Sequence, residues 1–186
     1  THKEIKRVYP FQNTASHFIG YVDIDNIGKA GIERSFNESL SNGKDIITSI
    51  DIHLQNAIQI ELKKTIEKFK AESGTSIVMN IKNGEILALN NFPDFDPNNL
   101  NKANSNQLLN RALQSNYEMG STFKPITVAM GIDDNSIDKD NIFDVSKPIN
   151  NISDYHPFDG FLGIKGIIVK SSNIGTAKIA KKIGKQ

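Results

Sequence analysis

Ser121 and Lys124 are the two side chains whose types and spacing could do covalent chemistry. They stand three residues apart where a polar turn leads into an apolar helix, and residues at this spacing share one helix face. A serine hydroxyl needs an adjacent base to act as a nucleophile, and a lysine amine becomes such a base when burial lowers its pKa. The first turn of a helix also offers free N–H groups to an oxyanion. The segment therefore predicts a nucleophile, its base and part of an oxyanion hole within one turn.

The Ser-x-x-Lys spacing is not specific by itself, because the chain repeats it at residues 41–44 and 136–139. Both repeats lie in Asn-, Gly- or Asp-rich segments that no helix follows. After Ser121, by contrast, Pro125 fits only near a helix start, which predicts a helix over 122–132. Four apolar residues are expected to form its packed face: Ile126, Ala129, Met130 and Ile132. The alternative interpretation is an ordinary helix start with no catalytic function.

A second polar interruption, Ser171-Ser172-Asn173, separates two apolar helical patterns. Serine and asparagine favour turns and caps because their side chains bond local backbone, so a helix–loop–helix with a serine N-cap is the simplest interpretation. The functional alternative places Ser171 and Asn173 opposite Ser121, where one relays a proton and the other holds an amide. The same pattern occurs at residues 35–37, so it does not decide between the two.

Composition narrows the classes of function. The chain has 186 residues, 38% of them hydrophobic, and a formal net charge of +1, a balance that indicates neither nucleic-acid binding nor attraction to an anionic membrane. It has no cysteine, and its four histidines show no ligand spacing, so neither a metal site nor a cofactor is expected. No apolar run reaches the roughly 20 residues that span a bilayer.

The first part of the chain predicts short elements and then one long helix. Residues 1–44 carry apolar clusters interrupted by glycines, typical of the end of a preceding module, with a short helix over 32–40 and a linker at 41–44. Asp51 is a candidate N-cap for a helix whose apolar residues recur at helical spacing until Ser73-Gly74 ends it.

The remaining elements suggest a helix packed on a sheet. Asn83-Gly84 between two apolar runs, 76–81 and 85–89, is a strong hairpin signal and predicts paired antiparallel strands. The rest of the chain predicts a loop over 92–106, a short helix at 108–113, strand candidates at 142–143 and 149, and helices over 163–170 and 174–183. The expected fold class is therefore α/β of the α+β type.

Taken in order, these stretches resemble the transpeptidase domain of class B penicillin-binding proteins, the cell-division (septal) type in particular. The resemblance covers nearly the whole chain. It is carried by His17–Tyr21 with Gly31–Glu33, Ser49–Asp51 with Leu54-Gln55, Asn83–Ala88 followed by Phe95–Asn98, Tyr117–Pro125, and Lys170–Gly175.

This resemblance implies the penicillin-binding-protein/serine β-lactamase-like fold, an antiparallel sheet with packed helices that is incomplete in this chain. It also implies two regions. Residues 1–44 would be the end of an N-terminal pedestal and its linker, and residues 45–186 would be the N-terminal half of the transpeptidase domain.

The resemblance also implies a reaction. Ser121 would attack a D-alanyl-D-alanine stem peptide to form an acyl-enzyme, with Lys124 as the base. Ser171 would pass the proton to the departing D-alanine, and Asn173 would bind the substrate amide and help position Lys124. The backbone N–H of Ser121 would supply one oxyanion donor. An amine from a neighbouring stem peptide would then form the cross-link, and β-lactams would acylate the same serine. Which residue is the base is disputed in this superfamily.

Three departures from the family matter. Met119 stands where the family usually has proline, which is expected to loosen the turn before Ser121. Residues 40–45 form a shorter stretch than in the family. No Lys-Thr-Gly follows in the sequence, although that motif supplies the second oxyanion donor and binds the substrate carboxylate. These 186 residues alone are therefore expected to be inactive.

Two alternatives remain open beside the transpeptidase. One is a β-lactam-recognising hydrolase or sensor of the same clan, and the other is a non-catalytic scaffold of the division complex. The resemblance further implies partners among division and cell-wall synthesis proteins. It places the protein on the extracytoplasmic side of the bacterial inner membrane, with a membrane anchor outside this chain.

Overall fold

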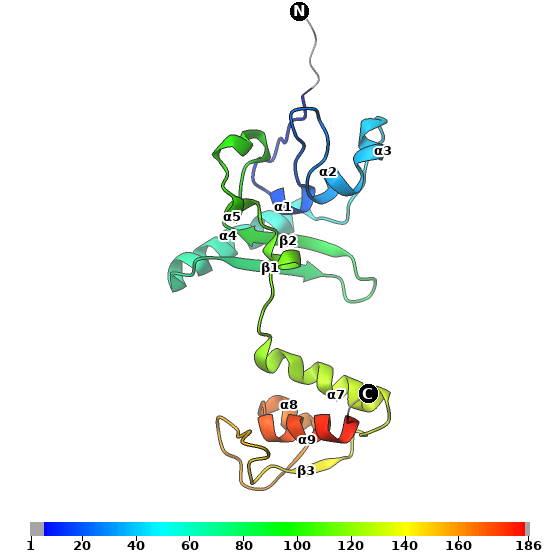
Figure 1. Ribbon diagram of the computed structural model, residues 1–186, viewed down its shortest axis with the longest axis vertical. Coiled ribbons are helices and arrows are strands. Elements are labelled where there is room, and N and C mark those ends of the chain that lie inside the picture. Colours follow the sequence, from blue (N-terminus) through cyan, green and yellow to red (C-terminus); the bar gives the residue numbers. More distant parts are fainter. Residues whose placement is uncertain (1–5, 185–186) are drawn as a thin grey trace, which may run out of the picture. The chain divides into compact units, whose positions relative to one another are not determined.

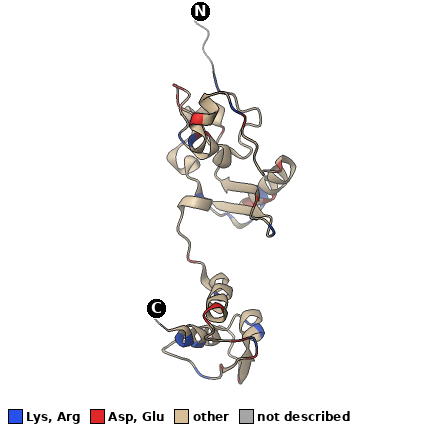
Figure 2. Ribbon diagram, turned by 90° about the vertical axis from the view of Figure 1, so that its right-hand side faces the viewer, with Lys and Arg blue, Asp and Glu red and all other residues tan. Residues whose placement is uncertain are grey.

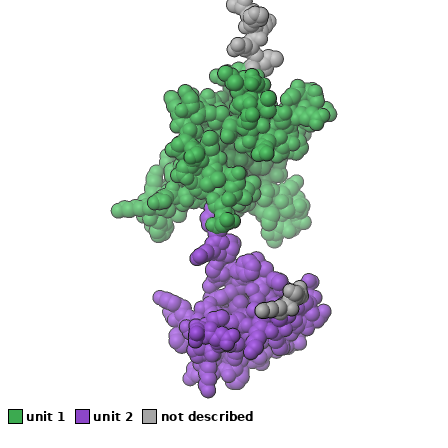
Figure 3. All heavy atoms as spheres, viewed as in Figure 1, with its two compact units in different colours: residues 1–116 green, residues 117–186 purple. Residues whose placement is uncertain are grey.

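The structure, a computed structural model, describes residues 6–184 and divides into two compact units, residues 1–116 and 117–186 (Figure 3). The boundary between these two units lies after Asn116. It does not test the expected domain boundary after Lys44, which stays a prediction.

Unit 1 is built from short helices, one long helix and a hairpin (Figure 1). In chain order its elements are α1 (Ser16–Ile19), α2 (Gly31–Ser35), α3 (Asn37–Ser41), α4 (Ile52–Phe69), β1 (Gly74–Met79), β2 (Ile86–Phe92), the 3₁₀ helix η1 (Pro97–Lys102), α5 (Ser105–Leu108) and α6 (Arg111–Gln114). The short helix expected over 32–40 is thus present as two pieces, α2 and α3.

The start of α4 is as predicted, but its end comes earlier. The Asp51 carboxylate accepts hydrogen bonds from the N–H groups of His53 (2.9 Å) and Leu54 (3.1 Å), which makes it the N-cap. The helix ends at Phe69 rather than at residues 73–74. Lys70 takes a left-handed conformation with φ 52°, and the chain turns away there.

The predicted hairpin is confirmed. Strands β1 and β2 pair antiparallel with Ile77 opposite Leu89, and β2 extends to Phe92, beyond the expected end at residue 89. Helix α4 packs on β2, as the helix-on-sheet prediction requires.

Gln55 on α4 forms hydrogen bonds with the edge of β2 that does not pair with β1. Its side-chain oxygen accepts the Leu89 N–H (2.8 Å), and its side-chain nitrogen donates to the Leu89 carbonyl (3.0 Å). The same nitrogen donates to Asn90 Oδ1 (2.6 Å), and Gln55 is fully buried. One side chain therefore takes the place of a neighbouring strand.

Replacing Gln55 with leucine is expected to destabilise the protein by about 3–5 kcal/mol. The volume is nearly kept, but both backbone groups of Leu89 lose their partners, and each buried unpaired group costs about 1–3 kcal/mol. Urea unfolding of the full-length parent measures the change. Asn56→Leu, an exposed amide on the same helix, serves as control and should change stability by no more than about 0.5 kcal/mol. Equal midpoints for the Gln55 variant and the parent would contradict the assignment.

Unit 2 is a small helical cluster over a two-stranded sheet (Figure 1). Its elements are the 3₁₀ helix η2 (Gly120–Phe123), α7 (Lys124–Asp133), β3 (Ile142–Asp144), β4 (Phe161–Gly163), α8 (Ile164–Val169) and α9 (Asn173–Ile183). The core comprises Val128, Ile137, Phe143, Val145, Leu162, Ile164, Ile167, Ile174 and Ile179. Two lysines lie in the last turn of α9, the blue segment beside the C-terminus in Figure 2, where positive charge favours the helix dipole.

Two strand predictions in unit 2 change. Residues 142–143 do form a strand, but its partner β4 was not predicted, because three residues before α8 are too few to show a strand period. The helix expected from residue 163 begins at Ile164. Ile149 is not in a strand and makes only an isolated bridge with Ile152.

The predicted packed face of the helix after Ser121 is wrong. Ala129 is exposed, and Ile126, Met130 and Ile132 are 46–51% exposed. The helix instead buries Lys124, Val128 and Gly131, a stripe at i, i+4 and i+7, and packs on α9. The buried side of α7 begins with a lysine. A search for apolar residues at helical spacing therefore selects the opposite side of the helix.

Candidate active site

All four residues predicted for the site lie in unit 2. Ser121 is in η2, and Lys124 is the first residue of α7. Ser171 lies in the turn between α8 and α9, and Asn173 is the first residue of α9. The site is thus built from the N-terminal ends of two helices that pack against each other.

The structure brings the lysine, the second serine and the asparagine together, and the role of each stays a prediction. Lys124 Nζ donates to the Ser171 carbonyl (2.5 Å), to Ser171 Oγ (2.9 Å) and to Asn173 Oδ1 (2.7 Å). Lys124 is only 8% exposed, because it leads the buried stripe of α7. An ammonium group has three N–H donors, so the protonated lysine is fully satisfied here by uncharged acceptors.

Two effects set the pKa of Lys124 in opposite directions. Burial lowers the pKa below its ordinary value, and the negative charge of Asp154 raises it, but burial is the larger effect. The net decrease favours the neutral amine that a general base requires.

Ser121 is exposed on the turn that precedes Lys124. Within the described residues no hydrogen bond joins its hydroxyl to Lys124, whose donors are directed at Ser171 and Asn173. Met119 has a φ of −66°, the value to which a proline would be locked, and the expected loosening of this turn stays a prediction. Its carbonyl also accepts the Thr122 N–H (3.2 Å).

Ser171 holds an uncommon backbone conformation. Its φ of 53° lies in the left-handed region, which is unfavourable for a residue with a side chain. This conformation ends α8 and gives Lys124 two acceptors from one residue, the carbonyl and the hydroxyl. Strained residues of this kind are often found at functional sites.

The simplest interpretation of Ser171-Ser172-Asn173, a turn with a serine N-cap, is confirmed, and the functional alternative stays a prediction. Ser172 is the N-cap of α9, since its Oγ accepts the Gly175 N–H (2.9 Å). The two residues on either side of it contact Lys124. Gly175 is required here by close packing, because a Cβ at this position would lie 2.6 Å from Ile167 Cγ1 of α8.

Ser153 and Asp154 were not predicted from the sequence. The Asp154 carboxylate accepts hydrogen bonds from Ser172 Oγ (2.8 Å) and the Ile174 N–H (2.9 Å). The Ser153 carbonyl accepts one from Asn173 Nδ2 (2.8 Å). The two residues stand in a polar stretch about twenty positions earlier, where no periodicity or motif distinguishes them.

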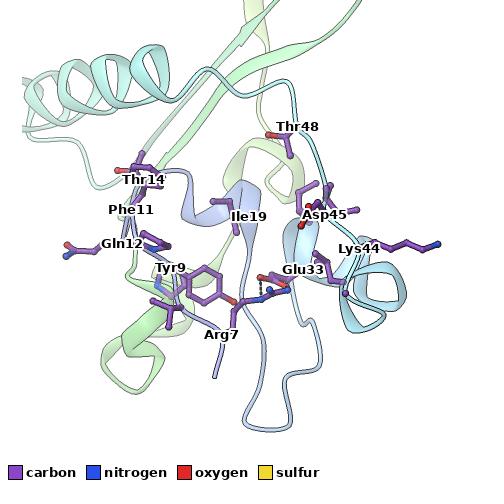
Figure 4. Close-up of a pocket in the computed structure, with 17 residues that line it drawn as sticks. Arg7, Tyr9, Phe11, Gln12, Thr14, Ile19, Glu33, Lys44, Asp45 and Thr48 are labelled. Carbon is purple, nitrogen blue, oxygen red and sulfur yellow. Dashed lines mark hydrogen bonds and ion pairs between the residues drawn. The ribbon is translucent and has the colours of Figure 1, made fainter. Parts of the chain in front are cut away.

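Unit 1 contains a cavity of about 480 Å³ that offers no comparable chemistry (Figure 4). On its wall Arg7 Nε pairs with buried Glu33 (2.9 Å), and Thr14 and Thr48 are among the other lining residues. Burial and the Glu33 charge raise the pKa of Tyr9 to about 12, so this phenol stays neutral. The ion pair ties the start of the described chain to α2, which indicates a structural role.

Known proteins match most of the chain. Residues 74–186 match the family described as "Penicillin binding protein transpeptidase domain". The chain is 39% identical to the probable peptidoglycan D,D-transpeptidase FtsI of Caulobacter vibrioides, over 97% of this chain and 32% of that protein. It is 35% identical to the probable peptidoglycan D,D-transpeptidase PenA of Neisseria gonorrhoeae, over 98% of this chain and 37% of that protein. The chain thus spans about a third of the length of these curated relatives.

A solved structure confirms the expected fold. Penicillin-binding protein 3 of Mycobacterium tuberculosis superposes with a TM-score of 0.81 at 25% identity, over 97% of this chain and 44% of that one. The mixed helices and small antiparallel sheets therefore belong to the penicillin-binding-protein fold, as the resemblance implied. On the family match over more than half of its residues, the chain belongs to the penicillin-binding protein transpeptidase domain family, as the resemblance to class B penicillin-binding proteins implied.

Proposed function

We propose that the chain is the part of a peptidoglycan D,D-transpeptidase that carries the nucleophile and its base. The observation that supports this proposal best is Lys124, a buried lysine of lowered pKa held by Ser171 and Asn173 one turn after Ser121. Such a lysine has no evident structural use, since an apolar residue would fill the same stripe without the cost of burying a charge.

The proposed reaction gives these residues the roles that the family resemblance implies. Ser121 Oγ attacks the penultimate D-alanine carbonyl of a stem peptide and loses its proton to neutral Lys124. The C–N bond then breaks, the proton returns to the departing D-alanine nitrogen through Ser171, and an acyl-enzyme remains. The amine of a second stem peptide displaces Ser121 and forms the cross-link. Asn173 binds the substrate amide, and the Ser121 N–H stabilises the oxyanion.

Neutral Lys124 fits this sequence of steps because of its hydrogen bonds. Three acceptors surround Nζ, but a neutral amine has only two N–H donors. On losing its proton Lys124 must therefore release one acceptor, and its lone pair becomes available to a hydroxyl. Ser171 Oγ lies 2.9 Å from Lys124 Nζ, so this hydroxyl is suited to exchange a proton with the lysine.

The cellular setting is part of the same proposal. Peptidoglycan stem peptides and β-lactams would be ligands, division and cell-wall synthesis proteins would be partners, and the site would face the extracytoplasmic side. Among the described residues no helix is both long and apolar enough to cross a bilayer.

The test compares the full-length parent with the 186-residue polypeptide, using labelled stem peptides and a labelled penicillin. The parent should release D-alanine, form cross-linked dimers and hold the penicillin as a stable adduct. Rapid release of penicillin without cross-links would indicate a hydrolase instead, and the absence of both activities would favour a scaffold.

The 186-residue polypeptide should be acylated at least about 10²–10³ times more slowly, the usual effect of losing one oxyanion donor. Its sequence holds no Lys-Thr-Gly, and one side of α7 is apolar and exposed. Labelling of this polypeptide at the rate of the parent would contradict that expectation.

A further inference from the structure

Asp154 binds the start of α9 with both of its oxygens. Oδ2 accepts the hydroxyl of Ser172, which is 1% exposed, and Oδ1 accepts the N–H of Ile174. The two bonds lie on either side of Asn173 in the chain. A carboxylate is well placed here, because the first turn of a helix presents unpaired N–H groups and positive charge.

The residue before Asp154 fixes the orientation of the Asn173 side chain. The Ser153 carbonyl accepts a bond from Asn173 Nδ2 (2.8 Å), which turns Asn173 Oδ1 towards Lys124 (2.7 Å). Without this bond the amide could rotate and present its N–H₂ group to the lysine. Residues 153–154 therefore hold both the backbone and the side chain of Asn173.

Asp154 also acts on Lys124 through its charge. Lys124 is faced by Ser171 and Asn173, which are uncharged, and Asp154 is the ionisable group among the described residues whose charge raises the pKa of the lysine. We propose that Asp154 is a positioning residue for acylation, which holds Asn173 and the Ser171 turn around Lys124. This inference rests on the proposed function.

Two substitutions in the full-length parent separate geometry from charge. Asp154→Ala removes both hydrogen bonds and should slow penicillin acylation about 10- to 100-fold, or roughly 1.4–2.7 kcal/mol, which is the size of a hydrogen bond to a charged group. Asp154→Asn keeps an acceptor for the Ile174 N–H but removes the charge. The pKa of Lys124 should then fall further, so the acidic limb of the acylation rate should move to lower pH. Asp159→Asn, an exposed carboxylate in the same loop, should change neither.

The pH profile distinguishes this role from a merely structural one. A slower rate with an unmoved limb in both Asp154 variants would overturn the inference, and so would parental behaviour of both. If Asp154→Ala does not fold, the position of the acidic limb of the acylation rate in Asp154→Asn tests the inference. Failure of the parent itself to react with penicillin would contradict the proposed function, whatever the Asp154 variants do.

Discussion

Replacing Ser121 with alanine in the full-length parent is expected to abolish the covalent penicillin adduct. The substitution removes the oxygen that forms the ester, and neither Lys124 nor Ser171 offers a substitute. The Lys124 amine is buried and bound to three acceptors, and Ser171 is already engaged by that amine. Folding should be little affected, because Ser121 is exposed. Intact-protein mass spectrometry after exposure to penicillin measures the adduct.

Ser136→Ala is the matched control, since Ser136 precedes Lys139 at the same spacing. Its N–H bonds the side chain of Asp134 in a loop, and it belongs to no helix start. This variant should be acylated like the parent. A stoichiometric adduct on the Ser121 variant would show that another residue is the nucleophile.

Replacing Lys124 with alanine should lower the acylation rate about 10²–10⁴-fold, the usual contribution of a general base. Lys124→Arg should be similarly impaired, because a guanidinium stays protonated near neutral pH. In the parent the rate should rise with pH as Lys124 loses its proton, and this rise should come below the ordinary lysine range because burial lowers the pKa of Lys124. Stopped-flow acylation across pH measures both effects.

Lys139→Ala controls for the loss of a lysine, because Lys139 is exposed. The Lys124 variants also leave Ser171 and Asn173 without their shared donor, so their thermal stability should be recorded alongside the rate. Rates within a few-fold of the parent in a folded Lys124→Ala protein would rule out Lys124 as the base.

Local signals in the sequence predicted local structure well. Asp51 caps α4, and Asn83-Gly84 joins β1 to β2, because caps and tight turns depend on a few adjacent residues. The prediction of the buried face of α7 was wrong for the opposite reason. Which side of an apolar helix is buried depends on its partner α9, and that partner contacts the side led by Lys124.

The same contrast between local signals and contacts made only in the fold applies to the candidate active site. Short sequence motifs identify the spacing of Ser121 and Lys124 and the turn at Ser171, so both could be recognised without coordinates. Asp154 is linked to Ser172 only through the folded loop, so no spacing rule identifies it. The meeting of Lys124 with Asn173 across 49 positions was predicted from family resemblance rather than from pattern.

Ser121 is proposed to be the nucleophile of a serine acyl-enzyme. Proteolytic digestion of the penicillin-treated full-length parent, followed by tandem mass spectrometry, locates the adduct directly. We expect one modified residue, Ser121, with unmodified peptides covering residues 41, 136 and 171. A single adduct on any of those three serines, or on Lys124, would contradict it.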